Sequence, residues 1–369
     1  MNIHHAVADY ERWLGGRLPL IAADLIIKHR LMREGAFPFL RGTYFRWAQR
    51  WPATCRDLLD APVVLAVGDL HVENFGTWRD AEGRLVWGIN DFDEVWRLPY
   101  TNDLVRLAVS VALAADASDL RLGIKDATTI LLSGYRESLA AGGQPVVLAE
   151  RHHALRKIAV SRLRNPEEFW AKLDAATPMR GVLPREARSA LAKLWPSRAL
   201  PWRVAHRIAG VGSLGRQRFV ALADWRGGRI AREAKGLAVS AAAWASGSRR
   251  VGRTLYATAL DRAVRCADPF VTVHEGWIAR RLAPDCSRIE LASLPRDRSE
   301  RHLLHAMGWE TANVHLGSAS ARTLLADLER RPKNWLVRAA AAMSDDVLED
   351  FAGWRAGPAS AKGRPAGRD

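Results

Sequence analysis

The stretch Gly-Asp-Leu-His-Val-Glu-Asn, residues 68–74, decides the fold of this chain. It follows a short apolar run at 63–67, whose β-branched character predicts a buried strand. A hairpin of two short strands is expected over 75–89, and it leads into Asn-Asp-Phe-Asp at 90–93. Each acidic segment therefore follows a strand, so its carboxylates would project from a rigid platform.

The spacing of these polar residues is typical of phosphoryl transfer. Asn74 comes five residues after Asp69, the interval between the catalytic Asp and the Asn of the kinase catalytic loop. Asp91 ends the hairpin, where kinases carry a metal-binding Asp. Such a reaction needs a carboxylate to deprotonate the attacking hydroxyl and oxygen ligands for Mg²⁺. Either motif alone is also typical of an ordinary capped turn, and only their conjunction indicates a Mg²⁺-phosphate site.

Residues 67–74 resemble the His-Gly-Asp-(Leu/Phe)-His-x-x-Asn loop of aminoglycoside phosphotransferases and of choline or homoserine kinase relatives. Val67 departs from this pattern, because those enzymes usually have His there. Residues 88–92 are similar to their Val-Ile-Asp-Phe/Trp segment, and residues 99–104 echo their Asp-Pro-x-x-Asp-Leu. The resemblance implies a kinase-like catalytic site.

A closer resemblance is to an uncharacterised bacterial family with kinase-like motifs. Its patterns Pro-Phe-x-Phe-x-Arg-Gly, Gly-Asp-x-His-x-x-Asn-Phe-Gly and Asn-Asp-Phe-Asp-Glu resemble residues 37–42, 68–76 and 90–94. This resemblance extends from about residue 30 to 320. It implies a fold more than a substrate.

Roles follow position by position from the kinase resemblance. It implies that Asp69 is the catalytic base, that Asn74 and Asp91 bind Mg²⁺, and that Asp93 binds a second metal ion or the substrate. His71 is expected to support the loop by hydrogen bonding.

The phosphate-holding half of the site is expected later in the chain. Residues 210–215 form a G-x-G-x-x-G pattern, and Lys235 ends the next predicted strand. Glycine lets backbone N–H groups approach phosphates closely. The candidate nucleotide-binding residues are Gly210, Gly212, Ser213, Gly215 and Lys235. The same pattern also suits a tight hairpin, and Lys235 could be a solvated lysine at a strand end.

Two candidate partnerships remain open. Arg41 could bind phosphate or substrate, or could equally pair with a core carboxylate such as Asp93 or Asp103. Kinases pair the nucleotide-binding Lys with a helix-borne Glu. No clear equivalent follows Lys235, and Glu275 is only a candidate.

The order of the motifs predicts the fold class. In ordinary kinases the glycine-rich loop and Lys precede the catalytic loop, whereas here they follow it. We therefore expect an α+β, helix-rich, protein-kinase-like (aminoglycoside phosphotransferase-like) fold of two lobes in circularly permuted order. Alternatively, the glycines only shape a hairpin, and an N-terminal element covers the nucleotide. The expected divisions are a helical catalytic lobe (1–204), a β-rich nucleotide-covering lobe (205–295), C-terminal helices on the helical lobe (296–356) and a disordered tail (357–369).

Composition narrows the function classes. The 369 residues are 48% hydrophobic and 26% charged, enough for two folded lobes. A net charge of +15 favours anionic ligands, but the basic residues are scattered and no nucleic-acid motif is present, so nucleic acid is not the expected partner. Three distant Cys and the lack of a long apolar run favour a cytoplasmic protein without disulfides or membrane contact.

These observations predict an ATP- and Mg²⁺-dependent phosphotransferase acting on a hydroxyl of a small molecule. The alternative is a non-catalytic, kinase-like nucleotide-binding or regulatory protein. A metallophosphoesterase is disfavoured, because the Asp-x-His and Gly-Asn-His blocks of such enzymes are absent. His302 and His305 have helical i, i+3 spacing, but without a nearby acidic residue a surface or core role is favoured over metal binding.

Overall fold

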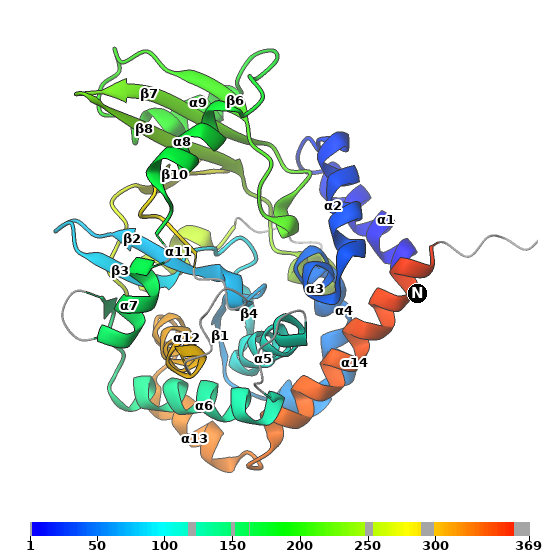
Figure 1. The fold of residues 1–369 in the computed structure, drawn as a ribbon. Coiled ribbons are helices and arrows are strands. Elements are labelled where there is room, and N and C mark those ends of the chain that lie inside the picture. Colours follow the sequence, from blue (N-terminus) through cyan, green and yellow to red (C-terminus); the bar gives the residue numbers. More distant parts are fainter. Residues whose placement is uncertain are drawn as a thin grey trace, which may run out of the picture.

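The computed structural model shows a helix-rich α+β protein (Figure 1). The N-terminal helices are α1 (Ile3–Gly15), α2 (Ala22–Glu34), α3 (Ala36–Gly42) and α4 (Tyr44–Thr54), with a 3₁₀ turn η1 (Arg56–Leu58). The helical spacing of apolar residues predicts a single helix over 7–34, but a break at 16–21 divides it into α1 and α2. The structure describes residues 2–116, 123–148, 152–161, 163–247, 254–288 and 299–357. The tail after 357, expected to be disordered, lies outside them.

The region around the loop at 68–74 contains short strands and long helices. Strand β1 (Val63–Ala66) pairs antiparallel with β4 (Trp96–Pro99), and β2 (Phe75–Arg79) with β3 (Leu85–Ile89). Between β1 and β2 lies the 3₁₀ turn η2 (Val72–Asn74). Strand β5 (Val146–Val147) extends the hairpin next to β3. The strand and the hairpin expected from the apolar pattern are both present.

Long helices bury this region in the main core. They are α5 (Tyr100–Asp116), α6 (Ile124–Ala140), α12 (Ser299–Leu316), α13 (Ala321–Arg330) and α14 (Trp335–Ala356). The side chains of α5 from residue 101 to 110 are all buried, whereas the other helices expose one face. The apolar run at 107–115, too short to span a bilayer, is thus part of a core helix. Among the described residues, no helix is long and apolar enough to cross a membrane.

A second, five-stranded sheet forms the other part of the molecule. Its antiparallel order is β6-β7-β8-β10-β9. The strands are β6 (Arg203–His206), β7 (Arg218–Trp225), β8 (Gly228–Gly236), β9 (Val271–His274) and β10 (Trp277–Leu282). In the β7–β8 turn, Arg226 and Gly227 both have positive φ, which suits the type I′ turns that match strand twist. The strand expected over 207–223 begins only at Arg218, because 211–213 form the 3₁₀ turn η3 (Val211–Ser213).

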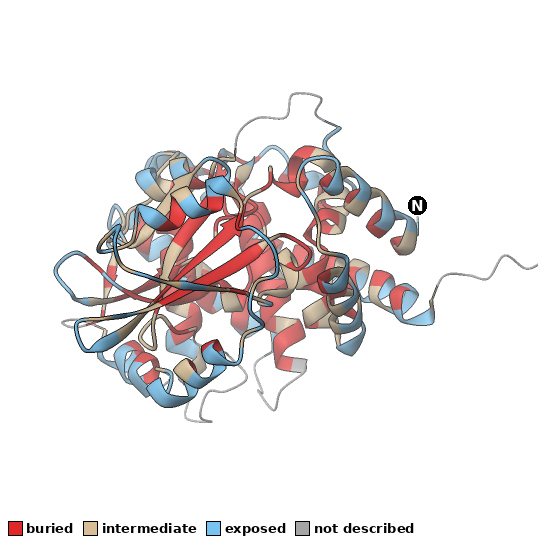
Figure 2. Ribbon diagram, turned by 90° about the horizontal axis from the view of Figure 1, so that it is seen from above, coloured by how far each residue is buried: buried red, intermediate tan, exposed pale blue. Residues whose placement is uncertain are grey.

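Two helices cover opposite faces of this sheet. Alternate side chains of β7 point to opposite faces, so Phe219 packs with α9 (Arg185–Ala192), while Val220 packs with α8 (Pro166–Asp174). Both helices lie in 1–204, the range expected to form the helical lobe, yet they pack on the sheet at the top of Figure 1. From above, the middle strands are buried and the flanking helices expose their outer sides (Figure 2).

Three short helices complete the described chain: α7 (His153–Ser161), α10 (Ala241–Ala245) and α11 (Tyr256–Arg262). The strand expected at 288–291 begins with an isolated bridge between Arg288 and Gly76, and its remaining residues lie outside the described ranges. The backbone N–H of Thr77 also donates to the carbonyl of Ser287, so the end of the sheet segment is tied to the β2–β3 hairpin.

Candidate active site

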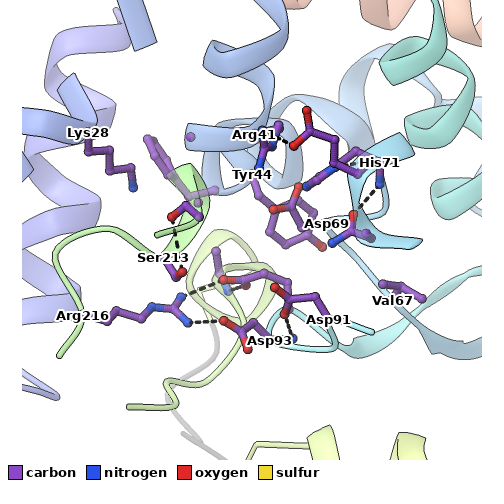
Figure 3. Close-up of a pocket in the computed structure, with 18 of the residues that line it drawn as sticks. Lys28, Arg41, Tyr44, Val67, Asp69, His71, Asp91, Asp93, Ser213 and Arg216 are labelled. Carbon is purple, nitrogen blue, oxygen red and sulfur yellow. Dashed lines mark hydrogen bonds and ion pairs between the residues drawn. The ribbon is translucent and has the colours of Figure 1, made fainter. Parts of the chain in front are cut away.

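Three segments meet in one cavity between the helical part and the five-stranded sheet (Figure 3). They are the loop at 68–74, the acidic segment at 91–94 and the glycine turn at 210–215. The cavity walls come from the helices α1 to α4, from the loop at 68–74, from the segment after β3 and from the β6–β7 turn. Nine of the residues expected at the site line this cavity: Arg41, Asp69, His71, Asn74, Asp91, Asp93, Gly210, Gly212 and Ser213. Residues more than a hundred positions apart are therefore brought together.

The loop at 68–74 is held by its own side chains. The imidazole Nδ1 of His71 accepts a hydrogen bond from the backbone N–H of Glu73 at 3.2 Å. The side-chain oxygen of Asn74 accepts one from the backbone N–H of His71 at 2.7 Å. Burial, together with Arg41 nearby, lowers the pKa of His71 well below its ordinary value, so the imidazole is neutral. Both residues thus shape the loop, and Mg²⁺ binding by Asn74 stays a prediction.

Asp103 on α5 holds the start of the loop by hydrogen bonds. Its carboxylate accepts hydrogen bonds from the backbone N–H groups of Val67 at 2.6 Å and of Gly68 at 2.9 Å. His315 on α12 contacts the same carboxylate at 3.1 Å, and Tyr135 contacts His315 at 2.8 Å. His315 is therefore a core residue. His305 has an acidic partner that the sequence did not reveal, Glu137 at 3.0 Å. In the described part of the chain, no group of three or more His, Cys, Asp or Glu side chains is arranged to hold a metal ion.

Gly68 is required by the geometry of this loop. Its φ is +81°, a conformation that other residues rarely adopt. A Cβ atom there would collide with the carbonyl oxygen of Glu94 and lie 2.8 Å from the hydroxyl of Tyr44. The backbone at the start of the loop is therefore packed directly against the acidic segment at 91–94.

Substituting Gly68→Ala is expected to destabilise the protein by about 2 to 4 kcal/mol, because backbone strain and overpacking add. Urea unfolding would measure the loss. Gly83→Ala is a matched control, since Gly83 also has positive φ but its Cβ would meet no atom within 4 Å. Equal losses in the two variants would mean that φ strain alone matters and that the contact with Glu94 does not.

Asp69 is fixed by a residue that the motifs did not reveal. The guanidinium of Arg106 on α5 donates through Nε at 2.9 Å and through Nη2 to the same oxygen, Oδ1. Arg106 is fully buried, and it lies 5.0 Å from the ring centroid of Tyr44 and 4.9 Å from that of Trp47. The signal that could have found it is a lone Arg in an apolar helix, because buried Arg is almost always paired.

Burial dominates the titration of Asp69. It raises the pKa of this carboxyl to about 7, although the positive charge of Arg106 acts in the opposite direction. Both hydrogen bonds from Arg106 go to Oδ1, and the second oxygen, Oδ2, faces the glycine turn, 3.3 Å from where a Cβ of Gly212 would lie. Asp69 is therefore a carboxylate that exchanges a proton near neutral pH, with one oxygen directed at the cavity.

Lys235 lies beside the second acidic segment. Its ammonium Nζ is 2.6 Å from Asp93 Oδ2 and 3.5 Å from Asp91 Oδ1, and its side chain is 2% exposed. Lys235 is thus not a solvated strand-end lysine. Glu275 is wrong as its partner, because Glu275 lies in the β9–β10 turn, more than half exposed, beside His274.

The pKa values of Asp91 and Asp93 are shifted in opposite directions. Burial would raise the pKa of Asp91, but the charges of Lys235 and nearby arginines hold it below its ordinary value. Burial and the negative charge of Asp91 raise the pKa of Asp93. Asp93 Oδ1 is buried and has no hydrogen-bond partner among the described residues. An unpartnered buried carboxylate oxygen suits a hard cation.

Only part of the glycine turn at 210–215 lines the cavity. A Cβ at Gly212 would lie 2.9 Å from the carbonyl oxygen of Arg41, so the turn lies directly on α3. Ser213 lines the cavity and accepts a 2.6 Å hydrogen bond from Arg218. Gly215 does not line it: its carbonyl accepts from Ile21 at 2.8 Å, and it packs on α2. Its φ of +95° makes it a turn residue, not a residue of the cavity wall.

Arginines bind the acidic residues around the cavity. Arg41 pairs with Glu73 at 2.6 Å, and not with Asp93 or Asp103. Arg216, which follows the glycine turn and is 3% exposed, pairs with Glu94 at 2.8 Å and contacts Asp93 at 3.4 Å. Sequence reasoning missed Arg216, because nothing in its local pattern indicates a partner so far away in the chain.

A larger cavity adjoins the first. Its volume is roughly 470 Å³, within the range of small-molecule sites. Arg280 and Leu282 of β10 line one side, and Trp78 and Asn90 line the other. Gly210 and Arg288 line both cavities, so the two cavities are adjacent there. The sequence contains no motif that predicts this cavity.

One family profile matches residues 20–187. Its description is "Uncharacterized protein conserved in bacteria (DUF2252)". The matched segment contains the loop at 68–74 and the acidic segment at 91–94 but ends before the five-stranded sheet. It is shorter than the expected range of about 30 to 320. No curated protein and no solved structure matches this chain. The likeness to an uncharacterised bacterial family is thus supported, and the likeness to aminoglycoside phosphotransferases stays a prediction.

Proposed function

We propose that this protein is an ATP- and Mg²⁺-dependent phosphotransferase that transfers a phosphoryl group to the hydroxyl of a small molecule. One observation carries the proposal. Asp69, with its pKa raised to about 7, shares a cavity with Asp91, whose partner is Lys235, and the glycine turn packs on that cavity. A base, a cation-binding carboxylate and a phosphate-binding amine are the parts that phosphoryl transfer needs.

Asp69 would act as the general base. Arg106 holds Oδ1, which fixes the carboxylate and leaves Oδ2 to accept the proton of the acceptor hydroxyl. A base with a pKa near the working pH combines a useful deprotonated fraction with sufficient proton affinity.

Asp91 and Asp93 would hold Mg²⁺. Asp93 Oδ1 lacks a partner among the described residues, and Asp91 is ionised at neutral pH because its pKa is lowered. A bound Mg²⁺ would neutralise the negative charge of the phosphates. Lys235, buried beside both carboxylates, would hold phosphate oxygens from the sheet side.

The larger cavity would take the base and ribose of the nucleotide. Its volume suits a base and ribose, and it shares Gly210 and Arg288 with the cavity that Asp91 lines, so the phosphates would extend toward Asp91. The order β6, glycine turn, β7, then β8 with Lys235 is also the order of a kinase nucleotide lobe. This order supports a kinase-like fold with its lobes permuted in sequence.

Thermal unfolding with ATP tests the proposal. ATP with Mg²⁺ is expected to raise the unfolding midpoint, because a ligand at a hundred times its Kd stabilises by about 2.7 kcal/mol. ATP without Mg²⁺ should raise it less, and Mg²⁺ alone should have little effect. Absence of any ATP·Mg²⁺ shift would contradict nucleotide binding.

A measurement of ATP turnover distinguishes a phosphotransferase from a non-catalytic nucleotide-binding protein. Phosphorus NMR of ATP with the protein would detect slow loss of the terminal phosphate to water or to added hydroxyl compounds. Binding of ATP·Mg²⁺ without any such loss would favour a non-catalytic nucleotide-binding protein.

A further inference from the structure

Lys28 is a buried lysine on α2 whose ammonium has no anion beside it. Its side chain is 4% exposed and lines the smaller cavity. Figure 3 shows it extending from α2 toward the cavity, on the side of Ser213 that lies away from Asp69. Within the described ranges, no hydrogen bond or ion pair involves its Nζ. Such a group is unusual, because lysine is almost never buried without a partner.

The other cations around this cavity are all paired. Arg41 and Arg288 contact Glu73, at 2.6 and 3.6 Å. Arg216 contacts Glu94 at 2.8 Å, while Lys235 contacts Asp93 at 2.6 Å. Among the described residues, Lys28 is thus the one Lys or Arg lining the cavity that has no carboxylate within ion-pair distance. Its positive charge remains available for a ligand.

Burial is the main factor that disfavours the charged form of Lys28. It lowers the pKa of Lys28, and the positive charge of Arg216 acts in the same direction. Glu11, Glu94 and Asp69 oppose the shift, but none of them reaches Nζ as an ion pair. An anion in the cavity would supply the missing partner and restore the charged form. Among the described residues no ion pair offsets this burial, and a bound anion would do so.

Lys28 lies outside the cavity proposed for the base and ribose of the nucleotide. That larger cavity shares Gly210 and Arg288 with the smaller one. Lys28 shares the wall of the smaller cavity with residues of α1 and α4, among them Tyr10, Tyr44 and Phe45. This wall is the helical side of the cavity, where a second substrate could approach Asp69 without displacing the nucleotide.

We propose that Lys28 binds a carboxylate or phosphate group of the acceptor, so that the substrate is an anionic hydroxyl compound. This inference rests on the proposed phosphotransferase activity. The acceptor's anionic group pairs with the ammonium of Lys28, and its hydroxyl lies toward Asp69.

Inorganic phosphate and acetate can probe this subsite, with glycerol as the uncharged comparison. Their effect on the unfolding midpoint would be measured for the full-length wild type, for Lys28→Met and for Lys125→Met. Methionine keeps the length of the side chain without its charge. Lys125, an exposed residue of α6, is the matched control, because phosphate also stabilises proteins non-specifically. Only the increment lost in Lys28→Met and kept in Lys125→Met reports the site.

We expect at least one of the two anions to bind wild type, and Lys28→Met to weaken that binding at least ten-fold. Without ligand, Lys28→Met should unfold at a higher temperature than wild type, since it removes an unpaired buried charge. Its response to ATP·Mg²⁺ should be unchanged. A response to phosphate alone assigns a phosphorylated acceptor, and a response to acetate alone assigns a carboxylate.

Three results would overturn the inference. Neither anion binds the wild type, or both bind Lys28→Met as well as wild type, or Lys28→Met loses ATP affinity, which would place Lys28 in the donor site. Failure of the phosphotransferase proposal is seen separately, as a wild type that does not respond to ATP·Mg²⁺. The anion titrations without nucleotide still measure whether Lys28 binds an anion in that case.

Discussion

Asp69→Asn is expected to lower the rate of phosphoryl transfer by about 10²- to 10⁴-fold, the usual contribution of a positioned general base. Asparagine keeps an oxygen that can accept the hydrogen bonds of Arg106, so the loop should retain its shape. It cannot accept a proton from the acceptor hydroxyl. The rate would be measured as ATP consumption under saturating Mg²⁺, and binding of ATP would be measured by thermal shift and should change little.

The pH dependence gives the same prediction a second readout. Asp69 works only when it is deprotonated, and burial raises its pKa to about 7. The wild-type rate should therefore rise with pH through about 7 and level off above it. Asp60→Asn, a change at a largely exposed carboxylate, is the control and should leave both rate and profile unaltered. A wild-type-like rate in Asp69→Asn would remove Asp69 as the base.

Asp91→Asn is expected to abolish the Mg²⁺-dependent part of the ATP stabilisation and to lower turnover at least a hundred-fold. Mg²⁺ in proteins is usually held by one or two carboxylates, and a neutral amide is a weaker ligand. The pKa of Asp91 is held below its ordinary value by Lys235 and nearby arginines, so the wild-type residue is charged at neutral pH. Thermal unfolding with ATP, with and without Mg²⁺, measures the effect.

Comparing ATP with and without Mg²⁺ in the Asp91→Asn variant separates the effect on metal binding from the effect on nucleotide binding. ATP without Mg²⁺ should stabilise Asp91→Asn about as well as wild type, because Lys235 and the glycine turn are intact. An undiminished Mg²⁺ increment in this variant would show that the metal, if bound, uses other residues. Loss of all ATP binding would instead indicate that Asp91 mainly positions Lys235, whose ammonium lies 3.5 Å from it.

Much of the catalytic-loop half could be predicted from local signals. The strand at 63–66, the hairpin at 75–89 and the acidic segment after it follow from short apolar runs and turn residues. The glycine pattern and the strand that follows it also predicted a lysine near the acidic segment, and Lys235 lies beside Asp91. Local patterns were less informative for helices: α8 and α9 have ordinary amphipathic sequences, and nothing in them shows which surface they cover.

The residues that control the carboxylates could not be predicted. Arg106 lies on a helix more than thirty residues after Asp69, and Arg216 lies more than a hundred residues after Glu94. Their partners are set by how the elements pack, and a charged residue in a sequence looks the same whether it is solvated or buried. The pKa of Asp69 near 7 is a consequence of that burial.

The sequence alone determined which chemical groups this protein can bring to a site: the Asp and Asn of the loop at 68–74, the carboxylates at 91 and 93, and the glycines and lysine that follow much later. These signals are readable because strand periodicity, turn chemistry and motif spacing are local properties of the chain. Only the tertiary structure decided which groups face one cavity, which arginines hold them, and that Lys28 has no anion beside it. Burial and charge pairing decide these features, and both depend on contacts between residues far apart in the sequence.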